Sequence, residues 1–294
     1  MSSEGVKVSI VLPTHNGSRF LRGAVDSCLS QTHRNIELIV VDDCSTDATP
    51  DILRAYEDPR LRTVRNTKNQ RLPRSLNIGF AKATGDYLTW TSDDNEYEPS
   101  SIERMLECLK QHPGTDFVYA DYWSLDEATG QKTLVRVPEP LRLGEKNEVG
   151  GCFLYTRRVY REVGNYEPNY EMVEDYDYWI RICKKFKAVR CPKPLYLYRY
   201  HAASLTSTRA HNQDLFDTIL KQRNGYLPLS RVGWTGLYYF ENVKKMGLNE
   251  EGKSRLLRQT MTKIAGLSVF YYVVFRAVVL YCGIRRAMRR ISTA

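Results

Sequence analysis

Pairs of acidic residues stand at the end or at the start of three separate segments of the chain. Their side chains could bind a cation or accept a proton. Asp42-Asp43 follows an apolar run, Asp93-Asp94 follows an aromatic stretch of β-forming residues, and Glu174-Asp175 precedes a helical pattern. Adjacent carboxylates repel each other, and a hard divalent cation that also binds phosphate oxygens would make such a pair favourable. For Asp93-Asp94 taken alone, an Asx-rich turn that caps the following helix is an equally good interpretation.

The segments that carry these acids alternate between strand and helix patterns. Strands are expected at 8–12 (ended by Pro13), 36–41, 62–65 and 86–91, and helices at 18–29 (capped by Ser18), after Asp47, and at 76–83. This order within about ninety residues predicts a doubly wound, mostly parallel α/β sheet with right-handed crossovers. Ligands of such sheets bind outside the carboxyl ends of the strands, so we expect Asp43 and Asp94 to share one edge.

Glycine-rich phosphate-binding motifs do not occur in this sequence. The first turn lacks Gly-x-Gly-x-x-Gly, and there is no Walker motif. Dinucleotide and P-loop nucleotide binding are therefore poorly supported. Acids at the ends of two strands indicate a metal-chelated diphosphate instead.

Length and composition are those of a folded globular protein. The chain has 294 residues, with 42% hydrophobic and 26% charged residues, enough for one large α/β domain plus an appendage or for two small domains. Its seven cysteines show no Cys-x-x-Cys spacing, which predicts reduced thiols rather than disulfides or a zinc site. No charged-then-apolar leader precedes Val8, so we expect a protein that is not secreted.

The second half of the pattern predicts a domain that continues to about residue 210. Strands are expected at 117–123, 134–137, 149–155 and 195–200, and helices from Pro99 to Leu109, at 157–163 and from about Tyr176. We predict a nucleotide-binding half at about 1–98 and an acceptor-binding half at about 99–210. We expect residues 211–294 to form a basic, helical C-terminal region.

The C-terminal region contains an apolar run followed by a basic cluster. Ala265–Ile284 carries one charge, Arg276, and four arginines follow within residues 285–290. Three interpretations are open: a helix or hairpin that dips into a membrane, a true span, and a helix buried against the domain or a second subunit. The arginines favour an anionic membrane surface, and no nucleic-acid motif accompanies the net charge of +9. We expect a cytoplasmic protein that is peripheral on the inner face of a membrane.

Taken in order, the motifs of residues 8–206 resemble the inverting glycosyltransferases of family 2, which have the nucleotide-sugar-binding GT-A fold. The matching segments are Val8–Asn16, Ser30–Thr32, Ile36–Asp47, Asn77-x-Gly79, Ala83–Tyr87, Ser92–Asp94 and Glu174–Trp179. The resemblance does not extend to residues 211–294.

The resemblance implies a donor site at the carboxyl ends of the first strands. The residues that it assigns to the nucleotide are Pro13, Thr14, His15, Asp43, Arg71 and Asp93. Asp43 would accept from the base N–H, which uracil offers, and Asp94 would bind Mg²⁺ or Mn²⁺ against the diphosphate. His201 would contact the metal or couple to it, with an ordinary loop histidine as the alternative. The family usually has Tyr in place of His15 and often Gly in place of Cys44.

The resemblance also implies that Asp175 is the catalytic base. Inversion needs one base for the acceptor hydroxyl and a metal for the leaving diphosphate, whereas glycoside hydrolases need two facing carboxylates. We therefore expect hexosyl-type transfer from a nucleotide-sugar, UDP-sugar first, to a glycan or lipid-linked hydroxyl in cell-surface polysaccharide or glycoconjugate synthesis. The alternatives are a polyprenyl-phosphate sugar synthase and a non-catalytic nucleotide-sugar-binding membrane scaffold. Trp179 is either core or a wall of the sugar site, and an oligomer is possible.

Overall fold

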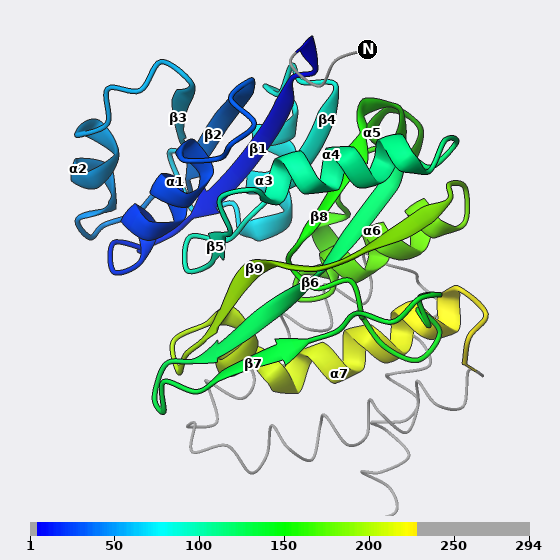
Figure 1. The fold of residues 1–294 in the computed structure, drawn as a ribbon. Helices are drawn as coiled ribbons and strands as arrows, with labels where there is room; N and C mark the ends of the chain where they lie inside the picture. The colour runs from blue at the N-terminus through cyan, green and yellow to red at the C-terminus, as the bar shows by residue number, and fades with distance from the viewer. Residues whose placement is uncertain (1–4, 228–294) are drawn as a thin grey trace, which may run out of the picture. The chain divides into compact units, whose positions relative to one another are not determined.

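A mixed sheet of nine strands organises the chain in the computed structural model, which describes residues 5–227 (Figure 1). The strand order is β3-β2-β1-β4-β8-β6-β9-β5, and β7 pairs with β6. The strands are β1 (Val8–Thr14), β2 (Ile36–Asp42), β3 (Leu61–Arg65), β4 (Tyr87–Trp90), β5 (Glu96–Tyr97), β6 (Phe117–Asp126), β7 (Lys132–Val135), β8 (Phe153–Thr156) and β9 (Ala188–Tyr200). The helices are α1 (Leu21–Leu29), α2 (Thr49–Arg54), α3 (Leu72–Phe80), α4 (Ser101–Gln111), α5 (Arg157–Val163), α6 (Glu174–Cys183) and α7 (Leu205–Arg223), with a 3₁₀ turn η2 (Pro168–Tyr170).

The first four strands form the predicted parallel half of the sheet. β1 lies between β2 and β4, and β2 pairs in parallel with β3. β1 and β2 are buried along their whole length, which explains their continuous apolar sequence. β1 continues through Pro13, beyond its predicted end, because β4 pairs only with Val8–Val11. One side of β1 therefore has no strand partner at Pro13, where the missing N–H costs no ladder bond.

The later strands differ more from the prediction. β8 is antiparallel to both β4 and β6, and β9 is parallel to β6. β9 starts at Ala188 instead of at 195, because irregular pairing next to Asp121 accommodates Pro192 and Pro194 within the strand. β5 was not predicted; its two residues pair with β9. The carboxyl end of β9 thereby reaches the turn that carries Asp93-Asp94.

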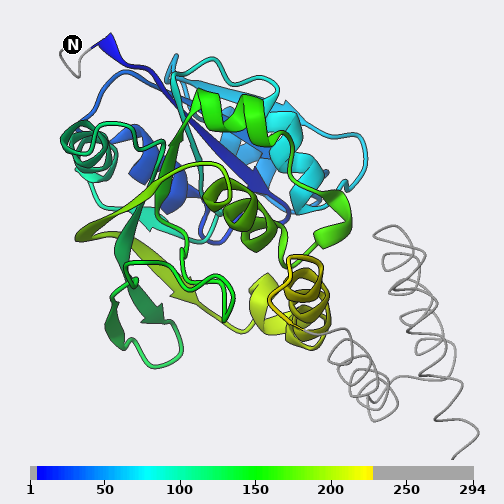
Figure 2. The same cartoon turned by 90° about the vertical axis from the view of Figure 1, so that its right-hand side faces the viewer.

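Helices pack on both faces of the parallel half (Figure 1 and Figure 2). The alternate residues Ile10 and Leu12 of β1 belong to one core cluster with apolar residues of α1, α2 and α4. On the other face α3 packs closely, since a Cβ added at Gly79 would lie 2.3 Å from the side chain of Val11. The helix after β1 begins at Leu21 with no side-chain cap, so the cap predicted at Ser18 is wrong. Ser18 instead donates its backbone N–H to Asp47.

The described chain divides into two compact units. The first comprises residues 1–168 and 175–202 and contains the whole sheet; the second comprises residues 169–174 and 203–294. Within the second, Ser204 caps α7 by accepting from the N–H of Ser207, and Arg223 donates to the hydroxyl of Tyr170. The predicted boundary at about 210 stays a prediction. Within residues 5–227 no helix has the length and apolarity needed to cross a membrane, and Ala265–Ile284 lies outside the described residues.

Candidate active site

The loop after β1 and the turn after β4 are joined through the carboxylate of Asp93. Thr14 Oγ1 donates to Asp93 Oδ2 at 2.5 Å, and the backbone N–H of His15 also donates to this carboxylate. A Cβ added at Gly17 would lie 2.0 Å from Asp93 Oδ2, so only glycine lets the loop come this close. Burial and the neighbouring charge of Asp94 raise the pKa of Asp93 to about 7. Three of the predicted nucleotide-binding residues are thus held together at the carboxyl edge of the sheet.

Asp43 organises a second segment of the same edge. Its carboxylate accepts from the side chain of Asn66 at 2.8 Å and from the backbone N–H groups of Gln70 at 2.7 Å and Arg71 at 2.8 Å. Arg71 adopts φ 68°, and the contact with Asp43 holds it in this unusual conformation. A carboxylate has about four acceptor positions, and these contacts use three. Asp43 therefore brings Arg71 to the site and keeps capacity for one more donor.

The ring of His15 is fixed beside Asp43. His15 Nδ1 lies 2.8 Å from the carbonyl oxygen of Asp43, which can only accept, so Nδ1 carries a proton. Pro13 is buried at the end of β1 and positions the loop that carries this ring. Cys44 follows with φ 64°, a left-handed conformation that glycine adopts without strain, which explains the family preference for glycine here.

Asp94 and His201 meet although they are far apart in the sequence. His201 Nε2 lies 3.0 Å from Asp94 Oδ2, while Asp94 Oδ1 is buried without a hydrogen-bond partner. The ring of His201 also packs on Phe20, with 5.1 Å between centroids. The predicted metal-binding residues therefore lie together.

The carboxylate of Asp94 suits Mg²⁺ or Mn²⁺, whereas the imidazole nitrogen of His201 suits Mn²⁺ better than the harder Mg²⁺. The buried, unpartnered Asp94 Oδ1 fits a cation that is held against a ligand. Within the part of the chain that the structure describes, no cluster of three or more His, Cys, Asp or Glu side chains could hold a metal alone. A cation at Asp94 would need further oxygens from a bound diphosphate and from water, as is usual for Mg²⁺.

Arg199 is a site residue that the sequence analysis did not predict. Its Nε donates to the carbonyl of Asp94 at 3.1 Å, and its backbone N–H donates to Asn95 Oδ1 at 2.7 Å. Its guanidinium lies over the ring of Phe20, 4.8 Å from the centroid. Arg199 thus fixes the turn that carries Asp94 from the end of β9. The two partners are more than a hundred residues apart, and no local motif indicates such a contact.

Asp175 lies at the start of α6, and its carboxylate faces the loop before β8. Asp175 Oδ2 accepts from Asn147 Nδ2 at 2.8 Å, and Oδ1 accepts from the N–H of Tyr176 at 2.7 Å. Burial raises the pKa of Asp175, and these two donors oppose that shift. By contrast, Asp177 is buried and paired with Arg181 at 2.7 Å. Of these two aspartates of α6, Asp175 is the one without a cationic partner.

Aromatic side chains link α6, just after Asp175, to the end of β4, and the rings of Tyr178 and Tyr166 stack with 4.0 Å between centroids. The pKa of Tyr166 is raised mainly by burial, then by Tyr178, and in smaller part by the charge of Asp175, which therefore lies within electrostatic range. Trp90 Nε1 donates to the hydroxyl of Tyr166 at 3.0 Å. Trp179 is fully buried, with its ring stacked on Phe117. Trp179 is therefore a core residue and not a wall of the sugar site.

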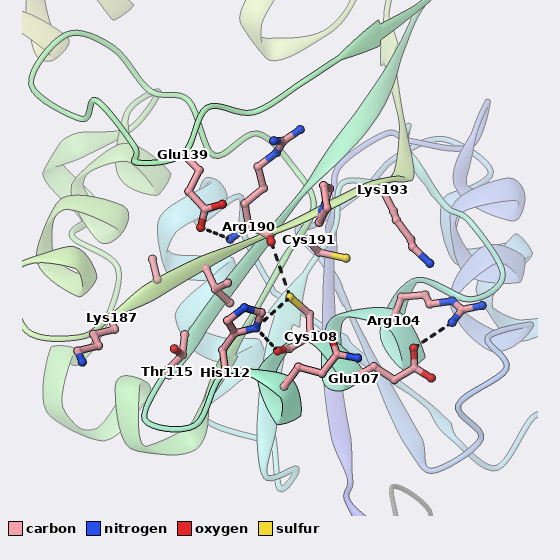
Figure 3. A pocket seen from close by; sticks show the side chains of 14 residues that line it. Arg104, Glu107, Cys108, His112, Thr115, Glu139, Lys187, Arg190, Cys191 and Lys193 are labelled. Carbon is pink, nitrogen blue, oxygen red and sulfur yellow. Dashed lines mark hydrogen bonds and ion pairs between the residues drawn. The ribbon is translucent and has the colours of Figure 1, made fainter.

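A groove of about 890 Å³ lies elsewhere, between the C-terminal half of α4 and the first residues of β9 (Figure 3). None of the predicted site residues lines it. His112 Nδ1 donates to the carbonyl of Cys108, and Arg190 pairs with Asp121 at 2.7 Å. Burial raises the pKa of Cys191 to about 11, so its thiol is protonated at neutral pH. Internal contacts occupy these polar groups, and the groove has no arrangement suited to catalysis.

Comparison of the sequence with known proteins identifies its family. The model of the family described as glycosyl transferase family 2 matches residues 9–165. An uncharacterised glycosyltransferase of Rickettsia prowazekii is 27% identical, with 92% of this chain and 90% of the relative covered. The Bacillus subtilis glycosyltransferase TuaG, named for teichuronic acid biosynthesis, is 30% identical, with 69% of this chain and 82% of the relative covered.

Solved structures share the fold at low sequence identity. The Staphylococcus aureus protein TarS, residues 1–349 in complex with UDP, has a TM-score of 0.61 at 13% identity, with 97% of this chain and 91% of that chain covered. The same region has also been solved with UDP-GlcNAc. A mannosyltransferase of Pyrobaculum calidifontis, solved with GDP-mannose and Mn²⁺, has a TM-score of 0.58 at 15% identity, with 93% and 86% covered. The predicted GT-A class of α/β fold is confirmed.

Proposed function

This chain belongs to glycosyl transferase family 2, and we propose that it transfers a hexose, with inversion, from a UDP-sugar to a hydroxyl group of a glycan or lipid-linked acceptor. The observation that carries this proposal is the pair of half-buried carboxylates after β4. Asp93 is satisfied by Thr14 and the loop after β1, whereas Asp94 keeps one buried oxygen with no partner. That arrangement suits a ribose and a cation-bound diphosphate better than it suits a structural turn.

The donor half of the proposal rests on Asp43 and His15. Asp43 retains one acceptor position, and the N3–H of uracil is a single donor that matches it. The ring of His15, fixed by the Asp43 carbonyl, offers an aromatic face beside the base. TarS bound to UDP and to UDP-GlcNAc supports a uridine donor, and the GDP-mannose complex of the archaeal enzyme makes a guanosine donor the comparison to test.

In the proposed reaction Asp175 accepts the proton of the acceptor hydroxyl. The hydroxyl oxygen forms a bond to the anomeric carbon on the face opposite the diphosphate, and the bond from that carbon to the β-phosphate oxygen breaks. The electron pair leaves on UDP, the new glycoside has inverted configuration, and Asp175 later releases its proton to water. Asp94 and His201 would hold Mg²⁺ or Mn²⁺, which neutralises charge on the departing diphosphate.

The hydrogen-bond partners of Asp175 favour a hydroxyl acceptor over a phosphate acceptor. A phosphate oxygen is already a nucleophile, whereas a hydroxyl needs a base, and Asp175 has a neutral amide and a backbone N–H as partners instead of a cation. The name of TuaG supports a polymeric cell-surface acceptor.

A donor screen tests the proposal. Purified full-length protein is incubated with UDP-, GDP-, dTDP- and CMP-sugars, with Mn²⁺, with Mg²⁺ or with excess EDTA, and nucleotide release is measured. We expect a UDP-sugar to be hydrolysed fastest and EDTA to abolish the release. With a saccharide acceptor, proton NMR of the product should show the anomeric configuration opposite to that of the donor. Retention of configuration would contradict the single-base mechanism, and equal release with EDTA would contradict the metal role.

A further inference from the structure

We propose that Asn147 is a positioning residue that orients the Asp175 carboxylate and favours its ionised form. The inference rests on the proposed role of Asp175 as the base. Asn147 lies in the loop between β7 and β8, and its Nδ2 donates to Asp175 Oδ2 at 2.8 Å. The contact leaves one lone pair of Oδ2 for a substrate hydroxyl and fixes the rotation of the carboxylate.

The loop that carries Asn147 is attached to the start of α6 at two neighbouring points. Besides the contact between Asn147 and Asp175, the hydroxyl of Tyr176 donates to the carbonyl oxygen of Leu143. Next to Asn147, the buried Glu148 accepts from the backbone N–H of Arg142 at 2.6 Å and from its guanidinium at 2.9 Å. The loop is therefore held in place without Asn147, whose own side chain is exposed. A substitution there should leave the fold intact.

The chemistry of an amide suits this position. A hydrogen bond to a carboxylate favours its charged form, which counters the burial of Asp175. A lysine or arginine at the same place would stabilise the charge further and leave a weaker base. An amide therefore keeps Asp175 ionised while preserving most of its basicity.

The charged groups around Asp175 are occupied elsewhere or neutral. On α6, Asp177 is paired with Arg181, and the buried Glu174 accepts from the backbone N–H of Met172 at 2.6 Å. On the loop, Lys146 and Arg142 both pair with Glu148. From the segment before η2, Tyr166 presents a phenol whose pKa burial raises well above its usual value, so it is uncharged. Among the described residues, Asn147 is the side chain that donates a hydrogen bond to the carboxylate of Asp175.

The test measures the pKa of Asp175 directly. Full-length protein is labelled with ¹³C-aspartate, the Asp175 carboxyl resonance is assigned by its loss in Asp175→Asn, and its pH titration is followed. In Asn147→Ala we expect the pKa of Asp175 to rise by about one unit, since a hydrogen bond to a charged group is lost. In Asn147→Asp we expect a larger rise, about two units, because two carboxylates would share the site. Lys146→Ala, on the same loop, should leave the titration unchanged.

Kinetics add a second readout. The acid limb of the kcat profile should move upward in Asn147→Ala by the same amount, with kcat about tenfold lower below the parental pKa and recovering at high pH. UDP affinity should be unchanged. A titration of Asp175 that is identical in Asn147→Ala and the parent would overturn the inference. Transfer by Asp175→Asn at the parental rate would instead overturn the base assignment in the proposed function.

Discussion

The buried Glu37 at the amino edge of the parallel half of the sheet and the half-buried pair Asp93-Asp94 at its carboxyl edge have opposite surroundings. At the amino edge Glu37, the second residue of β2, accepts from Ser9 Oγ at 2.5 Å, from the backbone N–H and hydroxyl of Thr84, and from Lys7 Nζ. These donors outweigh burial and lower the pKa of Glu37 to about 2. At the carboxyl edge Asp93 has its pKa raised to about 7, and Asp94 has a buried oxygen with no partner.

Under the proposed function, the contrast separates carboxylates that hold the fold from carboxylates that would contact a ligand. A buried charge that is fully hydrogen-bonded stabilises the folded state, whereas an incompletely bonded one costs stability and persists where a ligand completes it. The strained residues Asn16, Cys44 and Arg71 lie at the carboxyl edge too, in the loops that hold these acids. Substitutions at the two edges should therefore have opposite effects on stability and on activity.

The largest effect is expected at Asp175. Asp175→Asn keeps the size of the side chain but cannot accept a proton, so kcat should fall by about 10² to 10⁴. UDP affinity should change by less than about twofold, since the proposed base would contact the acceptor and not the nucleotide. Sugar transfer and calorimetric UDP titration measure the two quantities.

Asp177→Asn is the matched control on the same helix. It should remain far more active than Asp175→Asn but lose stability, because Asp177 pairs with Arg181. An inactive Asp177→Asn beside an active Asp175→Asn would assign the base to the other carboxylate.

The activity of the parent should also depend on pH in the direction that Asp175 sets. Burial raises the pKa of Asp175, and only the ionised form accepts a proton, so kcat should rise with pH through that elevated pKa. A profile of kcat between pH 4 and 9, with UDP-sugar saturating, measures this limb. The limb should be missing from the residual activity of Asp175→Asn.

Substitution of Asp94 should abolish the metal-dependent part of UDP binding and leave the fold intact. Asp94→Ala removes an unpartnered oxygen and relieves the repulsion of Asp93, but it also removes the contact with His201. Because these effects oppose each other, stability should change by less than about 1 kcal/mol. The strengthening of UDP binding by Mn²⁺, measured by calorimetry, should disappear. Mn²⁺ electron paramagnetic resonance in the presence of UDP gives an independent measure. Equal Mn²⁺ dependence in variant and parent would exclude Asp94 as a ligand.

Substitution of Glu37 should have the reverse effect, a loss of stability with no change in UDP binding. Glu37→Gln should lower the free energy of unfolding by about 2 kcal/mol at pH 7, since a charge with several donors is lost, and should leave UDP affinity unchanged. The lowered pKa means that this stabilisation is present above the unfolded value of about 4.5 and is lost as pH falls toward 2. Urea unfolding at pH 7 and pH 3 should show that parent and variant converge in acid. A variant that binds UDP less tightly would break the separation of the two edges.

Local pattern was sufficient to predict the parallel strands and the edge at which the acids gather. The strands at 36–41 and 62–65 and the helix at 157–163 were found because each has its own periodicity. The start of β9, the contacts of Arg199 and Asn147, and the donors of Glu37 were not predicted. Each of them depends on residues that meet only after the sheet has assembled, and no spacing in the chain encodes such meetings.

The smallest effect is expected at Cys44. Substitutions there test whether this position at the carboxyl edge requires a particular backbone conformation or a particular side chain. Cys44 has φ 64°, which costs an L-residue about 1–2 kcal/mol, while a glycine loses about 0.5–1 kcal/mol more conformational entropy on folding. The two terms nearly cancel, and the thiol makes only a weak contact of 3.7 Å with the carbonyl of Thr67. Cys44→Gly should therefore unfold in urea within about 1 kcal/mol of the parent and bind UDP equally well. Cys44→Val should lose more than about 1 kcal/mol, because a β-branched side chain tolerates this conformation least. If Cys44→Gly instead weakens UDP binding while Cys44→Ser restores it, the side chain and not the backbone is what this edge requires.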